Sequence, residues 1–539
     1  MAGIEIPLGK RGRLYRFFEV LPGLLSYTMI ILLVVLSLIS PVAGAIYLLV
    51  IIITTLVKAI GIAIRTIQGD RLLKRAMRVD WAKRLDHLEN PSDSYDRLAG
   101  TRNESYGFDQ HLKNLRMIAV AEPGYFPKPS TIYHAVIVTL FNESLDVLVP
   151  TIDSIKTTTF PNSRLIVILA YEERGGAEAE QTAKALEKKY QKTFKDFLLV
   201  KHPDGLKDEV IGKGGNITNA GLALKSYVAK KKIRFDQVIV TTLDSDNRPH
   251  ESYFDQTAYE YIVHEDRKHL SYQPVSLFMS NIWDAPAPMR IIAVGNSFWN
   301  VICSMRPHAL RNFASHSQPL DALVEMDFWS TRTIVEDGHQ YWRSLFYFNG
   351  NYEVIPIRAP IYQDAVLSNT VWKTLKAQFV QLRRWDYGAS DVAYVGTQLF
   401  SKNRPMKFRA LFPKFVRLLD GHITLAAVAP IIAFGGWVPL ITNYQSRSLL
   451  AYHLPNIVST IQLVASIGLF ITILLSFKML PKRPPRYRKS KNIIMLFQWV
   501  LMPVVSIIYS SFAAFYSQTR LLLGRYMEKF DVTDKAVKK

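Results

Sequence analysis

The chain has 539 residues, of which 49% are hydrophobic, and 66 Lys and Arg against 45 Asp and Glu give a net charge of +21. A mean hydropathy of +0.07 at 21% charged residues indicates long apolar segments joined to a polar region. The single cysteine, Cys303, excludes an intrachain disulfide framework and a cysteine-based zinc site. The basic clusters adjoin the apolar segments, so we expect a membrane partner and no nucleic acid.

Two apolar runs lie near the N-terminus, Leu24 to Ile39 and Val42 to Ile64. Each is close to the ~20 residues of a spanning helix. A signal peptide cleaved near Ala43 is the alternative, but cleavage there would leave a second long apolar run at the new N-terminus. We therefore predict a transmembrane hairpin over residues 1–66 and a basic juxtamembrane connector over 67–130.

Strand-like runs alternate with helical patterns over residues 131–400, which predicts an α/β domain with a parallel, Rossmann-like sheet. The runs are Ile132 to Leu140, Arg164 to Ala170 and Gln237 to Leu243. Ligands bind at the carboxyl ends of the strands in such sheets. Glu143, Glu172 and Asp244 each follow a predicted strand, so we expect three acidic groups at one edge of the sheet.

Asp244 and Asp246 occupy alternate positions where the third predicted strand ends, so both carboxylates can turn toward one cation. Carboxylate oxygens suit Mg²⁺ or Mn²⁺, and such an ion also holds a diphosphate. A nucleotide-sugar donor needs this help because its leaving group is a nucleoside diphosphate. A solvated acidic turn is the alternative for the pair alone.

Lys213 lies in a glycine-rich stretch that is not a Walker A loop, because no Ser or Thr follows the lysine. Further along the chain, Gln381, Arg384 and Trp385 fall at i, i+3 and i+4, on one face of a predicted helix. Trp385 offers a ring on which a sugar could stack, and Arg384 a guanidinium for a diphosphate. For Lys213 the alternative is a solvated lysine at a helix start. For Gln381, Arg384 and Trp385 the alternative is a helix packed on the sheet.

The C-terminal part alternates basic and apolar segments. Residues 401–420 read as an amphipathic helix at the membrane interface, or alternatively as a helix packed on the soluble domain. Residues 421–539 hold a C-terminal transmembrane region and a basic tail, with apolar segments Ile423 to Leu440, Ile457 to Phe477 and Ile493 to Ala514. The basic loop from Lys478 to Lys491 carries no acid and indicates a cytoplasmic side, which puts the middle region in the cytoplasm of a multi-pass protein of the cell membrane.

Three motifs occur in a fixed order between these apolar segments: Asp244-Ser245-Asp246, Glu336-Asp337 and Gln381-Leu382-Arg383-Arg384-Trp385. From about residue 130 to the C-terminus, the chain resembles the membrane-bound family 2 glycosyltransferases of the cellulose synthase and hyaluronan synthase type. The resemblance implies a GT-A domain and inverting transfer of a sugar from a nucleotide sugar, with a UDP-sugar as the expected donor. The implied product is a growing polysaccharide at the cytoplasmic membrane face, with or without its translocation.

The resemblance also assigns roles to residues. Asp337 is the implied general base and Glu336 beside it the second implied catalytic residue, while Gln381 and Trp385 are implied to bind the acceptor. The implied donor-binding residues are Glu143, Glu172, Lys213, Asn219, Asp244, Asp246 and Arg384, with the metal on Asp244 and Asp246. Two positions depart from the family pattern: Val335 replaces a threonine, and Glu172 replaces the aspartate that contacts the nucleotide base. The tail segment Val532 to Lys535 is similar to that of many bacterial members.

Two other functions stay open. Transfer of one sugar to a lipid acceptor fits the same motifs, and five apolar segments are fewer than a large synthase has. A non-enzymatic basic scaffold tethered to the membrane is the third hypothesis, although it gives the acidic motifs no reason to occur in family order. The sequence identifies no partner subunit.

Overall fold

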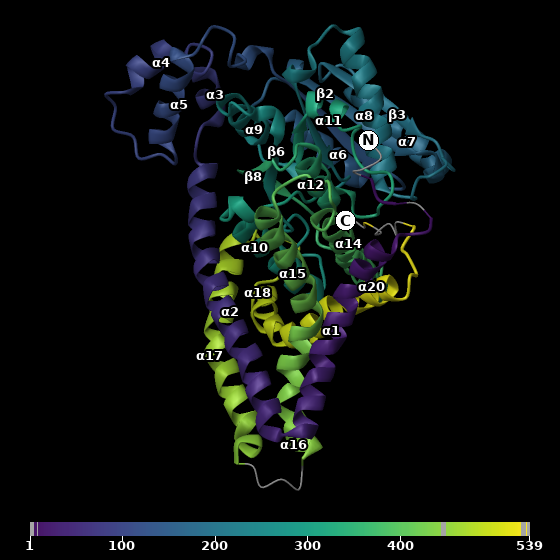
Figure 1. The fold of residues 1–539 in the computed structure, drawn as a ribbon. Coiled ribbons are helices and arrows are strands. Elements are labelled where there is room, and N and C mark those ends of the chain that lie inside the picture. Colours follow the sequence, from purple (N-terminus) through teal and green to yellow (C-terminus); the bar gives the residue numbers. More distant parts are fainter. Residues whose placement is uncertain (1–4, 8, 444–448, 530–534, 536–539) are drawn as a thin grey trace.

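The computed structural model describes residues 5–7, 9–443, 449–529 and 535, and it shows an α/β domain at one end of a bundle of long helices (Figure 1). Two of these helices are α1 (Arg13–Ile39) and α2 (Pro41–Met77). Ser40 separates them with an extended backbone, and its side chain accepts a hydrogen bond from the Ala43 amide. Pro41 at the first helical position needs no amide partner, which suits the start of α2. The predicted N-terminal pair of helices is therefore present.

The predicted connector is mostly helical. α2 continues beyond residue 66 as far as Met77, and three short helices follow it: α3 (Trp81–His87), α4 (Pro91–Leu98) and α5 (Phe108–Val120). Figure 1 shows α3, α4 and α5 beside the α/β domain, at the end of α2 that leaves the bundle.

A single mixed sheet forms the centre of the α/β domain, with strand order β3-β2-β1-β4-β7-β6-β8-β5. Its strands are β1 (Tyr133–Leu140), β2 (Leu165–Glu172), β3 (Asp196–His202), β4 (Val238–Leu243), β5 (Arg248–Pro249), β6 (Leu270–Leu277), β7 (Ser317–Pro319) and β8 (Glu353–Tyr362). β3, β2, β1 and β4 are parallel neighbours, while β7 is antiparallel to β4 and β6. The predicted α/β fold between apolar helices is confirmed.

Helices cover both faces of the sheet. The helices of this region are α6 (Leu145–Lys156), α7 (Gly176–Tyr190), α8 (Lys213–Lys230), α9 (Tyr253–Val263), α10 (Ala287–Ser304), α11 (Leu320–Glu325), α12 (Glu336–Tyr347), α13 (Val371–Asp386) and α14 (Asp391–Leu399). Of these, α13 and α14 pack mainly on other helices rather than on the sheet. Alternate residues of β1 enter two cores: Val136 packs with Ile152 of α6, and Ile137 with Ile217 of α8. Burial on both faces explains why β1 is a continuous apolar run rather than an alternating one.

Two further long helices complete the bundle. α15 (Phe408–Phe434) and the short α16 (Val438–Thr442) cover the apolar segment and the predicted amphipathic segment from residue 408 onward, while residues 401–407 of that segment are not helical. Leu411, Phe415 and Leu418 of α15 are buried in one core with Trp342 of α12. α17 (Leu449–Met479) covers the next predicted apolar segment and packs along α2.

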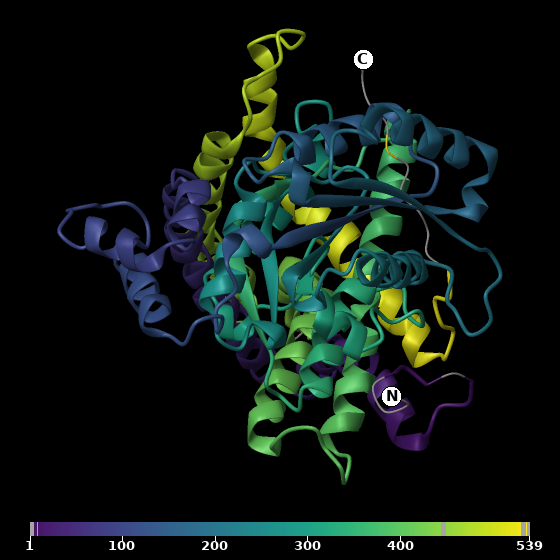
Figure 2. The same cartoon turned by 90° about the horizontal axis from the view of Figure 1, so that it is seen from above.

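The last apolar segment is built differently. α18 (Ser490–Phe497), α19 (Met502–Val505) and α20 (Phe512–Leu522) follow one another through a 3₁₀ turn and a π turn. Both views show this segment running across the bundle, beneath the α/β domain (Figures 1 and 2). Within the described residues, four helical stretches are long and apolar enough to cross a membrane: Arg13–Ile39, Pro41–Met77, Phe408–Thr442 and Ser490–Leu522.

Candidate active site

Three adjacent parallel strands present acidic groups at their carboxyl ends. Glu143 follows β1, Glu172 ends β2 and Asp244 follows β4. Glu143 Oε2 accepts the Phe141 amide at 2.8 Å, and Glu143 Oε1 accepts the Ser245 hydroxyl at 2.9 Å. The side chains that follow β1 and β4 therefore meet across neighbouring strands, as the sequence predicts.

Lys213 lies at the centre of the predicted set. Its Nζ is 2.9 Å from Asp244 Oδ1, 3.2 Å from Asp337 Oδ2 and 3.9 Å from Glu336 Oε1. Lys213 is the first residue of α8, while Glu336 and Asp337 open α12. A Cβ at Gly214 would collide with the Ser330 carbonyl oxygen and lie 3.3 Å from Glu336 Cβ, so glycine permits the start of α8 to approach this segment and the start of α12 closely.

Burial and neighbouring charge set the protonation of these groups. Burial alone would raise the pKa of Asp244, but the ammonium groups of Lys213 and Lys535 outweigh it and lower that pKa to about 2. Burial, and then the charge of Asp337, raise the pKa of Glu336 to about 8. Burial opposes the charge of Lys213, but Asp244, Asp337 and Glu336 together raise its pKa well above the ordinary value. At neutral pH the site therefore holds an ionised Asp244, a charged lysine and a largely protonated Glu336.

His316 borders the same cluster and was not predicted from the sequence. Its Nδ1 donates to the Phe313 carbonyl at 2.9 Å and lies 3.9 Å from Asp337 Oδ1, while its Nε2 accepts from the Trp329 indole at 3.4 Å. Full burial lowers the pKa of His316, which keeps the imidazole neutral. No local motif marks this histidine, because it reaches Asp337 only through the fold. His339, two residues after Asp337, is instead held 2.7 Å from Asp391.

A second cation lies against the aspartate pair. Lys535 Nζ is 2.7 Å from Asp246 Oδ1, 2.8 Å from Ser245 Oγ and 4.0 Å from Glu143 Oε1. The Asp364 amide donates to Asp246 Oδ2 at 3.1 Å, and burial, followed by the charge of Asp246, raises the pKa of Asp364 to about 7. In the sequence, Lys535 stands out only as part of a tail resemblance, and no local motif marks Asp364. Residues 532–534, just before Lys535, lie outside the described residues.

The residues at this edge of the sheet fit a divalent cation. An ammonium already lies against Asp246 and beside Glu143, which shows that the carboxylate arrangement attracts positive charge. Oxygen ligands from Asp244 and Asp246 suit Mg²⁺ or Mn²⁺. No cluster of three or more His, Cys, Asp or Glu ligands is found among the described residues, so an ion here needs water or ligand oxygens to complete its shell.

The predicted motif helix is α13. The charge of its Arg384 adds to the lowering of the Asp244 pKa and opposes the raising of the Glu336 pKa, which places the guanidinium within electrostatic reach of the cluster. Trp385 is 38% exposed, and its ring lies 6.1 Å, centroid to centroid, from the Phe278 ring just after β6. Gln381 accepts a hydrogen bond from Gln378 within α13 at 3.1 Å.

Two predicted donor-binding residues lie further out. Glu172 pairs with Arg174, and burial, the largest influence, raises the pKa of Glu172. Asn219 Nδ2 donates to the Lys201 carbonyl at 3.1 Å, on the edge strand β3. The ion pairs of Lys213 include neither Glu172 nor Asn219. These two residues would reach a bound nucleotide only if it extended along the edge of the sheet toward β2 and β3.

No family model matches this chain, and no curated protein matches it. Solved structures similar to it include a mannosyltransferase from Pyrobaculum calidifontis in complex with GDP-Man and Mn²⁺, at 12% identity and a TM-score of 0.38 over 83% of this chain and 99% of that one. Another is residues 1–349 of S. aureus TarS in complex with UDP-GlcNAc, at 11% identity and a TM-score of 0.34, which covers 73% of this chain and 93% of that one.

Proposed function

We propose that the chain is a membrane glycosyltransferase with a GT-A domain on the cytoplasmic side, which transfers a sugar from a nucleotide-sugar donor with inversion. One observation carries the proposal: the Lys213 ammonium lies within 4 Å of carboxylates from two motifs, at Asp244, Glu336 and Asp337. These motifs are far apart in the sequence, and the third contributes the charge of Arg384. A non-enzymatic basic scaffold would not explain why acids from separate motifs lie around one lysine.

The donor end of the proposed reaction is the DxD side of the site. Mg²⁺ or Mn²⁺ on Asp244 and Asp246 would supply charge neutralisation for a departing nucleoside diphosphate. Arg384 and Lys213 add two protein cations to the same region, and an anionic diphosphate can take over the contact that Lys213 now makes with Asp244. A UDP-sugar is the donor that we propose, with Glu143, Glu172 and Asn219 along its path.

The acceptor end is the start of α12. In the proposed mechanism, Asp337 accepts the proton of an acceptor hydroxyl as that oxygen attacks the sugar C1 from the face opposite the diphosphate. Lys213 donates to both carboxylate oxygens of Asp337, at 3.4 and 3.2 Å, and so orients the base. A largely protonated Glu336 can donate a hydrogen bond to an oxygen of the acceptor substrate. A single displacement of this kind inverts the anomeric centre.

The full chain in lipid nanodiscs should release nucleoside diphosphate from one member of a panel of nucleotide sugars. Asp337→Asn should slow the transfer by about 10²–10⁴-fold while donor binding, measured by calorimetry, persists. Asp109→Asn is the matched control, because Asp109 also lies in the first turn of a helix and is exposed. Equal turnover in the two variants would remove Asp337 from the mechanism.

A polysaccharide is the product that we propose, because the exposed Trp385 ring can stack on a sugar and stacking tolerates sliding by one unit. Transfer of one sugar to a lipid is the second candidate. Mass spectrometry of the lipid and water-soluble fractions separates the two, since a glycolipid with one sugar as the sole product would exclude polymer synthesis.

A further inference from the structure

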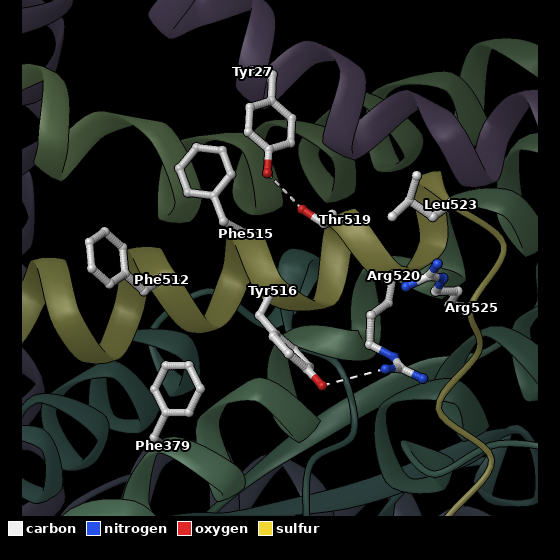
Figure 3. Close-up of a pocket in the computed structure, with 9 residues that line it drawn as sticks. All are labelled: Tyr27, Phe379, Phe512, Phe515, Tyr516, Thr519, Arg520, Leu523 and Arg525. Atoms are coloured by element: carbon white, nitrogen blue, oxygen red, sulfur yellow. Dashed lines mark hydrogen bonds between the residues drawn. The ribbon is translucent and has the colours of Figure 1, made fainter.

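A pocket of about 400 Å³ lies away from the acidic cluster, between α1, α13 and α20 (Figure 3). Its two ends differ in character. Phe379, Phe512 and Phe515 line one end, while Arg520 and Arg525 lie at the other. A hydrogen bond of 2.7 Å between the Tyr27 and Thr519 hydroxyls joins α1 to α20 at the pocket wall.

The arginine end carries positive charge, and among the described residues Arg520 has neutral oxygen acceptors but no carboxylate as its hydrogen-bond partners. The Arg520 guanidinium donates to the Tyr516 hydroxyl at 3.4 Å and to the Tyr526 carbonyl at 3.0 Å. Its Nε is buried and has no hydrogen-bond partner. The Arg525 side chain is exposed beside it. A phosphate accepts several such charge-assisted bonds at once, so it complements this end of the pocket.

The apolar end and the position of the pocket identify the rest of the ligand. Phe512 is 53% exposed and Leu523 is 57% exposed, on the segment that runs across the helix bundle. Exposed apolar and aromatic side chains beside arginines, on a helix that crosses a set of long apolar helices, are typical of a membrane interface. A small water-soluble anion would use only the arginines of this pocket, and a purely apolar ligand only the phenylalanines.

We propose that this pocket binds one anionic phospholipid from the adjacent leaflet, with the headgroup phosphate at Arg520 and Arg525 and an acyl chain along Phe379, Phe512 and Phe515. The lipid is a bound ligand and not the sugar acceptor. Its binding does not depend on the proposed transfer reaction, so either proposal can fail without the other.

Contacts of the pocket with α13 give the lipid a structural consequence. Arg383 Nη1 donates to the Tyr516 hydroxyl at 3.4 Å, and its guanidinium lies 5.1 Å from the centre of the Tyr516 ring. Ser517 of α20 also donates to the Arg383 carbonyl. α13, the helix that carries Arg384 and Trp385, is therefore tied through Arg383 to the wall of the lipid pocket, and a bound lipid would hold this helix at the membrane surface.

The test is a lipid titration of the purified full chain in detergent, followed by native mass spectrometry. The probes are phosphatidylglycerol and phosphatidylcholine with identical acyl chains. Arg520→Gln with Arg525→Gln removes the proposed headgroup contacts, and Arg488→Gln with Lys489→Gln is the matched control because it removes the same charge from two exposed side chains of the basic loop. Phe512→Ala shortens the apolar end.

We expect one phosphatidylglycerol to bind the wild type and the control about tenfold or more tightly than phosphatidylcholine, and the arginine variant to lose that preference. The phenylalanine variant should bind both lipids more weakly. Arg525→Gln alone, at an exposed side chain, keeps the test valid if the double variant does not fold, and it should lose part of the preference. Equal binding of the two lipids by the wild type, equal loss in the control, or displacement of the lipid by millimolar inorganic phosphate would each overturn the proposal.

Discussion

Replacement of Lys213 by methionine should destabilise the α/β domain strongly, because it leaves a group of acids without their cation. Lys213 is only 7% exposed and lies within 3.2 Å of both Asp244 and Asp337. Removal of one partner from a buried ion pair typically costs about 3–5 kcal/mol. At about 2–4 °C of melting temperature per kcal/mol in a domain of this size, we expect a decrease of roughly 10 °C.

The matched control is Lys201→Met. Lys201 pairs with Glu173 at 3.0 Å, nearly the same distance, but 42% of its side chain is exposed. Because solvent screens an exposed pair, the same substitution there should leave the melting temperature unchanged. The assay is fluorescence-detected unfolding of both variants in one detergent, without nucleotide or metal.

Two further measurements link the loss to the acids. The folded pKa of Asp244, about 2, lies below its ordinary value of 3.8, so its contribution to stability is present above about pH 4 and is lost as the pH falls toward 2. The difference between Lys213→Met and the wild type should therefore shrink over that range. Addition of Asp244→Asn should restore part of the stability, because it removes one uncompensated charge. Equal melting of the two lysine variants at pH 7 would refute the reasoning.

The other predictions concern Glu336, Asp246, Lys535 and Trp385. The pKa of Glu336 is raised to about 8, so its contribution to stability is present below its ordinary pKa of 4.5 and declines as the pH rises toward 8. Glu336→Gln should therefore flatten the decline of the melting temperature over this pH range. Parallel curves of melting temperature against pH for the variant and the wild type would contradict this prediction. Asp246→Asn should weaken Mn²⁺ binding, measured by electron paramagnetic resonance, by at least about tenfold. Lys535→Met should strengthen Mn²⁺ binding, because it removes the ammonium from Asp246. Unchanged Mn²⁺ affinity in both variants would exclude the metal site. Trp385→Ala should shorten the proposed polymer while donor binding persists, and a product of the same length as that of the wild type would exclude the stacking role.

The sequence predicted the parts of the site that follow from local pattern. Glu143 and Asp244 lie where the apolar runs of their strands end, and in a parallel sheet those ends meet. Arg384 and Trp385 share a helix because their spacing matches the helical repeat. Runs and repeats are properties of neighbouring residues, so one sequence is sufficient to find them.

The unpredicted parts depend on contacts between distant segments. His316 precedes a strand of only three residues, β7, which pairs antiparallel with β4 and carries no recognisable apolar run. Lys535 reaches Asp246 from the C-terminal tail, and Asp364 reaches it through a backbone amide two residues after β8. Nothing in the local sequence of these residues indicates which carboxylate they will meet.

The C-terminal tail should lie on the same side of the membrane as the α/β domain. Five crossings from a cytoplasmic N-terminus would put the tail outside, although its basic residues, with Lys538 and Lys539 beyond the described part of the chain, indicate the cytoplasm. We infer that the stretch Ser490–Leu522, although long and apolar enough to span a membrane, does not cross it, because it runs across the bundle and its helix α20 packs on α13. Crossings by α1, α2, α15 and α17 then return the tail to the starting side.

The contact of Lys535 with Asp246 requires the same side independently of any count of helices. A cysteine at Lys529, in a Cys303→Ser background, should react with an impermeant maleimide only after the membrane is opened. A cysteine at Asn443, at the far end of the bundle, should react in intact cells. Labelling of the Lys529 cysteine in intact cells would place the tail outside, and it would exclude Lys535 from a cytoplasmic active site.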